Sequence, residues 1–252
     1  MSHDHVGVPR FIEEGFSNNG RVYCYNLVID KIYPTNTERL GTKNNYYDDD
    51  VEKDLLAQDV EHQFSLFYKD FCSTRDPDVM VKILNLNQRL VKEFLSFMCM
   101  RSKKVLDEIN ANSFSSLLLG NLSHSRLLRI NSFLKVDFLK MIENKHSYHP
   151  LINCSKTHLI NNSVGYGITL LGDKVNSFYM PLNYRVGILV TSDSETQNGD
   201  VIWIMPSEDK VAMRLNRSIC VTEKVLGNGF IFSDDRKLLE HNAEYIRTGK
   251  IV

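Results

Sequence analysis

One arginine lies on a helical stripe that is apolar apart from Asn87 and the arginine itself, and its charge needs a chemical explanation. Between Met80 and Val105, large apolar residues recur at spacings of three and four, which is typical of the buried face of a helix, and Arg101 falls on that face. Burying an unpaired charge is costly, so Arg101 needs an acidic partner or an anionic ligand unless its head reaches water at the edge of the core. Two interpretations follow: a structural ion pair or edge arginine, and a site that binds an anion such as phosphate.

Side chains of the types that bind zinc gather in one short stretch, which contains His146, His149, Cys154 and His158. Zinc sites use such ligands at a few recurrent spacings, and this spacing matches none of them. We therefore expect surface or turn histidines here, with no tightly bound zinc.

Consecutive acids at Asp48, Asp49 and Asp50 precede a stretch with helical periodicity. There they would cap the helix and complement its dipole. The alternative is a role in binding a metal. The sequence predicts no cofactor and leaves a divalent metal open.

The common nucleotide-binding and hydrolase motifs do not occur: the sequence has no Walker loop, G-x-S-x-G, H-E-x-x-H or G-x-G-x-x-G. The glycine pair in VGYG, at 164–167, favours a tight turn over a phosphate cradle. Trp203 lies in an alternating apolar segment, which predicts a core position rather than a ligand contact.

The elements that must position these residues fall into three regions. Region 1–47 is extended, because GRVYCYNLVIDKIYPT is rich in aromatic and β-branched residues and follows the turn sequence SNNG. Its strands are expected at Arg21–Val28 and Lys31–Pro34. Region 48–148 is helical, and its helices are expected from Val51, over Pro77–Asn110 with room for a break, and over Ser113–Asn144.

Region 149–252 mixes strands with helices. SFYMPLNYRVGILVTS, GDVIWIMPS and GFIFSDD predict strands, Ser207 could cap a helix that ends near Val225, and DDRKLLEHNAEYI predicts a last helix. The fold class is therefore α+β: the N-terminal β-hairpin and the C-terminal strands form a sheet, which the long helical middle segment covers. We predict a single domain over 1–252. If the chain were divided, the best candidate boundary would be His149–Lys156.

Composition bounds the compartment and the partners. The formal net charge is -1, so no global basic field attracts nucleic acid, although a local patch could. The cysteines number 5 and show no C-x-x-C, which favours reduced thiols in a cytoplasmic protein. Neither a signal peptide nor an apolar run long enough to cross a bilayer is recognisable, so no membrane partner is expected.

The opening of the chain resembles a known family. HVGVPRFIEEGFSNNGRVYCY is similar to the start of the domain-of-unknown-function family numbered 4238, an uncharacterised, mainly prokaryotic group. Its members begin with His-Tyr-Val-Pro-Arg-Phe, then Leu-x-x-Phe, a short turn and an aromatic strand. The residues that match are Pro9, Arg10, Phe11 and Phe16. The family histidine falls at Val6, while His5 lies one residue earlier.

The resemblance continues in order along nearly the whole chain. FLSFMCMRSKKVLDEI is similar to a family helix that ends in an apolar run and Arg-Ser/Thr, which places Arg101 on the family arginine and Met98 on a family glutamine. INNSV stands where the family has Asp-Asn-Pro-Val. The remaining family positions, an aromatic, two glutamates, an acid and a late asparagine, fall on Tyr47, Glu52, Glu61, Asn161 and Asn216. The family carries no assigned reaction, so the resemblance implies an architecture and candidate positions only.

Three functions fit these residues. A nuclease-like effector of a toxin or phage-defence kind would use histidine and glutamate as general base and acid, and arginine to stabilise phosphoryl charge. Its candidate catalytic residues are His5, Glu61 and Arg101, and its candidate binding residues are Arg10, Tyr47, Glu52, Asn161 and Asn216. A module without catalysis would use the same arginines to recognise an anion, a nucleotide, nucleic acid or a protein partner, and the sequence slightly favours it. In a structural or protein-interaction module, Arg101 and Glu61 would form an ion pair.

The N-terminal stretch through Phe16 is expected to be ordered and close to Arg101. Chain ends are loose unless something holds them, and Phe11, Ile12 and Phe16 offer apolar anchors. Those anchors would fix Arg10, for which we expect a carboxylate such as Glu61, or a bound anion, as partner.

Overall fold

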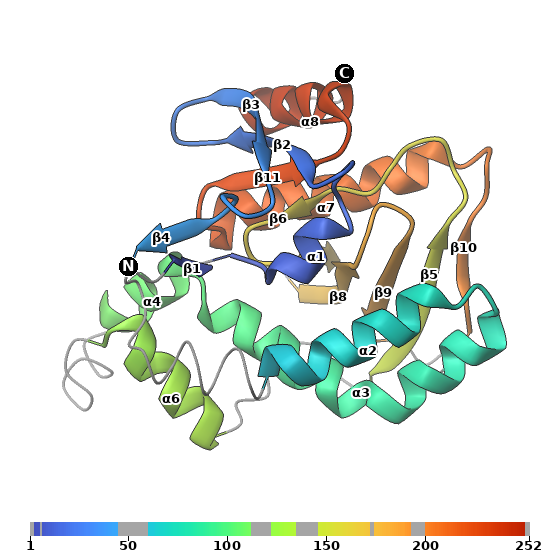
Figure 1. Cartoon of the computed structure of the whole chain (residues 1–252), viewed down its shortest axis with the longest axis horizontal. Coiled ribbons are helices and arrows are strands. Elements are labelled where there is room, and N and C mark those ends of the chain that lie inside the picture. Colours follow the sequence, from blue (N-terminus) through green and yellow to red (C-terminus); the bar gives the residue numbers. More distant parts are fainter. Residues whose placement is uncertain are drawn as a thin grey trace.

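The computed structural model describes residues 3–5, 7–44, 60–111, 122–134, 146–171, 174–192 and 200–249, and Figure 1 shows their arrangement. The strands are β1 (His3–His5), β2 (Arg21–Asn26), β3 (Lys31–Asn36), β4 (Thr42–Asn44), β5 (Ser147–Asn153), β6 (Asn161–Asn162), β7 (Gly167–Leu171), β8 (Lys174–Pro181), β9 (Val186–Thr191), β10 (Ile202–Ile204) and β11 (Phe230–Ser233). The helices are α1 (Arg10–Glu14), α2 (Glu61–Ser73), α3 (Pro77–Met100), α4 (Lys103–Ala111), α6 (His124–Leu134), α7 (Asp209–Leu226) and α8 (Arg236–Thr248). The fold class is α+β, as the sequence predicts.

The larger sheet has the strand order β10-β5-β9-β8-β7, and only its β10–β5 pair is parallel. The best candidate boundary, His149–Lys156, overlaps β5, which lies between β10 and β9 inside this sheet. Pro150 is tolerated within β5 because the pairing with β10 starts at Leu151, so its missing N–H interrupts no bond on that side.

The smaller sheet joins the two ends of the chain. Its strand order is β3-β2-β11-β6, so the N-terminal hairpin pairs with a C-terminal strand as the sequence predicts. Asn19 and Gly20 have φ of 52° and 73°, the conformation of the tight turns that precede such a hairpin. β2 ends at Asn26 rather than Val28, because the Asn26 side chain accepts hydrogen bonds from the N–H groups of Val28 and Ile29 and starts the turn.

Besides these two sheets, β1 and β4 pair in a separate two-stranded one. Helices cover and connect the larger and the smaller sheet. α3 packs on β5, α8 packs on β2 and β11, and α7 contacts both β7 of the larger sheet and β6 and β11 of the smaller one (Figure 1). The predicted helix over Pro77–Asn110 breaks at Arg101, and Ser102 accepts a bond from the Val105 N–H at the start of α4. Ser207 does not cap α7, whose N-cap position is Glu208.

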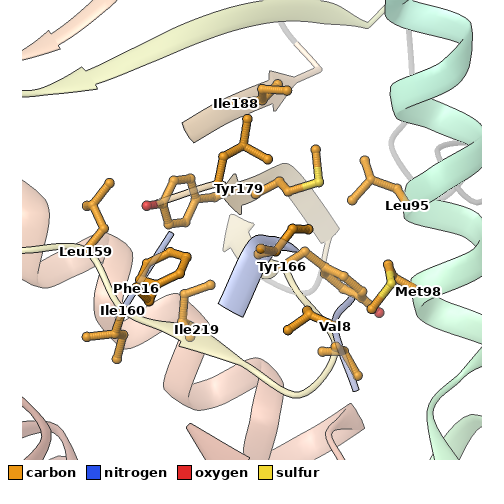
Figure 2. Close-up of a cluster of buried hydrophobic side chains, with 14 of the residues drawn as sticks. Val8, Phe16, Leu95, Met98, Leu159, Ile160, Tyr166, Tyr179, Ile188 and Ile219 are labelled. Carbon is orange, nitrogen blue, oxygen red and sulfur yellow. The ribbon is translucent and has the colours of Figure 1, made fainter. Parts of the chain in front are cut away.

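The N-terminal segment is part of the core. Val8 and Phe16 are fully buried, and Figure 2 shows both side chains among residues of α3, α7 and the larger sheet. The residues labelled around them are Leu95, Met98, Leu159, Ile160, Tyr166, Tyr179, Ile188 and Ile219. Apolar burial contributes about 25 cal/mol per Å², so these contacts hold the start of the chain in place. The predicted ordering holds for residues 7–16.

Two coarse expectations can be compared with the structure. All five cysteines are free thiols, and all but Cys72 and Cys154 are buried. Among the described residues, no helix combines the length and the apolar character needed to cross a membrane. The acids Asp48, Asp49 and Asp50 and the expected helix start at Val51 lie outside the described residues.

Candidate functional site

Arg101 is buried in an ion pair. Its side chain is 2% exposed, and its Nη1 donates to Glu61 Oε1 at 2.6 Å. Glu61 is the first residue of α2 and Arg101 directly follows α3, so the pair joins the start of one helix to the end of the other. Of the two interpretations of Arg101, this geometry matches the structural ion pair.

The Arg101–Glu61 pair also lies close to α1. Burial raises the pKa of the Glu13 carboxyl on α1 well above its usual value, and the nearby positive charge of Arg101 opposes that rise. The predicted proximity of the N-terminal stretch to Arg101 is thus confirmed. The expected carboxylate partner of Arg10 is confirmed in kind, but it is not Glu61: Arg10 is half-exposed and contacts Glu14 at 2.9 Å and Glu38 at 3.4 Å.

The two candidate asparagines bind the backbone. Asn216 accepts from the Ile160 N–H at 3.0 Å and donates to the His158 carbonyl at 2.9 Å. Asn161 donates to the Pro181 carbonyl at 3.1 Å and accepts from the next N–H at 2.8 Å. Both are 0% exposed, so these amides serve the backbone inside the core and do not reach a ligand. His5 lies in β1 with its side chain outside the described part, and Tyr47 and Glu52 lie outside the described residues.

The residues of zinc-binding type have separate partners. His149 is buried, and its Nδ1 lies 3.0 Å from the Asp200 carbonyl oxygen, while His158 contacts Asp234. Within the described ranges, no group of three or more His, Cys, Asp or Glu side chains could hold a metal ion.

An open cleft of about 590 Å³ lies where the edge of the larger sheet meets the connection between α2 and α3. We call it the Trp203 cleft. Its floor is apolar and includes Met80, Ile152 and Val186, and its polar and aromatic lining includes Glu14, Arg75, Cys154, Tyr184, Arg185 and Trp203. Figure 1 shows β10, which carries Trp203, at the same end of the molecule as the α2–α3 connection. This volume is typical of small-molecule sites.

Trp203 corrects the sequence interpretation. Its side chain is 44% exposed, and it lines the cleft instead of the core. Strand pairing explains this: Trp203 pairs with Ile152, which pairs with Val186, so the three residues share one face of the sheet. β10 is an edge strand only three residues long, so the indole lies at the margin of that face.

The turn between β8 and β9 supplies Tyr184 and Arg185. The Asn183 side chain accepts from the N–H groups of Arg185 and Val186, both at 2.8 Å, which closes a tight turn of a kind that asparagine favours. Gly15 packs against this turn, since a Cβ there would lie 2.9 Å from the Leu182 carbonyl oxygen. The sequence placed these residues in strands and offered no signal that they end in a cleft.

Arg185 is held by several partners. Its Nη1 donates to the carbonyls of Ser155 and Asn153, and its Nη2 lies 3.3 Å from His158 Nε2. Because arginine can only donate, Nε2 must accept, which puts the imidazole proton on Nδ1. That Nδ1 lies 3.0 Å from Asp234 Oδ2.

These contacts form a chain from Asp234 through His158 to Arg185. The imidazole also lies over Tyr184, with ring centroids 4.7 Å apart. These contacts fix the position of Arg185. They use fewer than the five N–H donors of a guanidinium, so Arg185 can still donate to an anion.

The charge balance of the cleft is positive. Arg75 and Arg185 contribute two positive charges, whereas the Glu14 carboxylate is paired with Arg10. Cys72 is the second thiol of the lining, and burial raises its pKa to about 12, so it remains a protonated thiol. The cleft thus combines an apolar floor and two aromatic side chains with two guanidinium groups.

Comparison with known protein families, curated proteins and solved structures finds no match to this chain. The resemblance of its opening motifs to the family numbered 4238 stays a prediction.

Proposed function

We propose that the protein recognises a nucleotide, free or within a nucleic acid, in the Trp203 cleft. One observation carries the proposal: the half-exposed indole of Trp203 shares an open cleft with Arg75 and with Arg185, which His158 helps to hold in place. A nucleobase offers a flat π face for stacking on an aromatic side chain, and a phosphate offers paired oxygens for a guanidinium. The apolar floor suits the base better than it suits a bare anion.

Recognition without catalysis is the form of this function that the residues support. The candidate acid Glu61 and the candidate arginine Arg101 are bonded to each other, away from the cleft. The cleft lining does not include His158, which faces Asp234 and Arg185. We therefore infer a binding role and assign no general base.

Intrinsic fluorescence provides a direct test, because Trp203 is the single tryptophan of the chain. We expect a saturable change in emission on titration with a nucleoside monophosphate. A stacked base contributes about 1–3 kcal/mol, so the nucleoside alone should still bind, but more weakly because it lacks the phosphate that the guanidinium groups contact. Inorganic phosphate should leave emission unchanged, because it has no base to stack on the indole.

A variant pair completes the test. Arg185→Ala should weaken nucleotide binding about tenfold or more, as expected for loss of a charge-assisted bond. Arg89→Ala is the matched control, because Arg89 is exposed and lies outside the cleft in a pair with Glu93. The proposal is overturned if no nucleotide changes the emission up to about 1 mM, or if the two variants bind alike.

A further inference from the structure

A second hollow lies between α7 and α8, which pack side by side in Figure 1. It has a volume of about 590 Å³, and we call it the α7–α8 groove. Its charged and titratable lining consists of Lys210, Arg214, Arg217, His241 and Asp209. Four of these five groups are basic types in a protein whose formal net charge is only -1, so positive charge is concentrated here.

The one acid of this groove is engaged. Asp209 Oδ1 accepts from the Thr157 backbone N–H at 2.9 Å, and this bond lowers the pKa of its carboxyl, with a smaller contribution from the charge of Lys156. The nearest acids along α8, Glu240 and Glu244, are paired with arginines of the same helix. Asp209 stays ionised and offsets one positive charge, so Lys210, Arg214 and Arg217 leave the groove with a net positive charge beside its apolar residues.

The groove and the Trp203 cleft border the same segment of chain, residues 154–158. Cys154 lines the cleft, and its N–H donates to the Ile204 carbonyl, next to Trp203. Three residues later, Thr157 holds Asp209 at the edge of the groove. Lys156 lies between them and is exposed. Positive charge thus continues from Arg185 in the cleft, past Lys156, to the groove.

We propose that the α7–α8 groove binds the phosphate backbone of a single-stranded nucleic acid whose base occupies the Trp203 cleft. This inference rests on the proposed function and names its ligand class as an oligonucleotide. Single strands are bound where a basic groove follows the backbone and aromatic side chains stack on bases, and the two hollows supply one part each. The apolar groove residues, Met213 and Leu238, would contact sugars.

The test compares ligands of different length. A mononucleotide and a single-stranded oligonucleotide of about 12 residues, within the usual site size, are titrated against the full chain by Trp203 emission. The oligonucleotide should bind at least about tenfold more tightly, and its affinity should fall more steeply with salt.

Charge reversal in the groove separates the two sites. Arg214→Glu should weaken oligonucleotide binding about tenfold and reduce its salt slope by about one, while mononucleotide binding stays at the wild-type value, which also shows that the variant is folded. Arg236→Glu is the matched control, because Arg236 lies on α8 outside the groove lining.

Three outcomes would count against the proposal. If the mononucleotide binds but the oligonucleotide binds no better and Arg214→Glu changes nothing, the groove proposal fails and the cleft proposal stands. If neither ligand binds, the cleft proposal fails too. If polyglutamate of equal length displaces the oligonucleotide with the same affinity and the same sensitivity to Arg214→Glu, the groove is a site for acidic protein segments instead.

Discussion

At the scale of single residues, buried charge separates structural roles from binding roles. Arg101 and Arg185 are both held by side-chain contacts, but Arg101 is buried against Glu61, whereas Arg185 lines a cleft. Burying a charge requires a partner, and a group that is fully paired inside the core has no donor for a ligand. The candidate residues of the resemblance that the structure describes with their side chains thus belong to the scaffold, apart from surface Arg10.

We predict that Arg101→Met destabilises the fold by about 3 kcal/mol, because it leaves Glu61 without its partner beside the core. Arg89→Met is the matched control, since Arg89 pairs with Glu93 at 2.8 Å but is 76% exposed, and it should change stability by less than about 1 kcal/mol. Urea unfolding followed by circular dichroism measures both. If Arg101→Met in combination with Glu61→Leu is no more stable than Arg101→Met alone, the pair does not explain the loss.

Glu13 should make stability depend on pH. Its pKa in the folded state is raised above the unfolded value of about 4.3, so its contribution to stability is present in full below that pH. The contribution is lost as pH rises through the folded pKa, at about 1.4 kcal/mol for each unit of difference. Glu13→Gln should therefore gain stability relative to wild type as pH rises from about 4.3.

Chemical denaturation of both proteins at several pH values measures this effect. Glu240→Gln, which removes an exposed carboxylate from α8, controls for a change of surface charge. Parallel stability curves for wild type and Glu13→Gln over the whole range would contradict the prediction.

At the scale of elements, glycines allow two turns to pack closely against the N-terminal segment, and these contacts fix where the turns lie. The turn before β7 contains Gly165, with φ of 76°, and a Cβ there would lie 2.7 Å from Val8 Cγ1. The cleft turn is closed in a comparable way, by Asn183 and by the contact with Gly15. Short local signals therefore specify the turns, and packing against a distant segment fixes their positions.

Gly165 and Gly20 form a matched pair for testing this packing. Their φ values are 76° and 73°, so an alanine at either meets the same backbone penalty of about 1–2 kcal/mol. Only at Gly165 does the added Cβ collide with Val8, which adds about 1–3 kcal/mol of overpacking. We expect Gly165→Ala to lower the melting temperature more than Gly20→Ala. When both variants are made in a Val8→Ala background, the difference between their shifts should become smaller. Equal shifts would show that Val8 does not pack there.

At the scale of the whole molecule, the chain closes on itself through the sheets. β2 from the beginning pairs with β11 from the end, and β5 follows the helical region yet lies inside the larger sheet, between β10 and β9. α7 contacts both sheets. A cut within β5 would remove a strand from the interior of a sheet, and one cluster of buried side chains draws on the N-terminal, helical and C-terminal regions.

We therefore expect one cooperative unfolding transition for the chain. Fluorescence of Trp203 in the larger sheet and far-ultraviolet circular dichroism should report the same urea midpoint. Limited proteolysis should not cut near His149, which is 0% exposed. Two stable fragments that separate at His149, or two distinct midpoints, would show two domains instead of one.

The sequence by itself determined the features that depend on local patterns. Periodicity identified the buried face of α3 and put Arg101 on it, and turn residues marked the hairpin that pairs with β11. Side-chain spacing and turn chemistry act over a few residues, so they can be read without the fold.

Only the tertiary structure decided which residues share a site. Trp203 has the alternation of a core strand, and its exposure follows from the position of β10 at an edge of the sheet. Arg185 meets His158 across 27 positions, and His158 meets Asp234 across 76. No local pattern encodes such contacts, because they form only when strands that are distant in sequence pair and bring their turns to one end of the sheet.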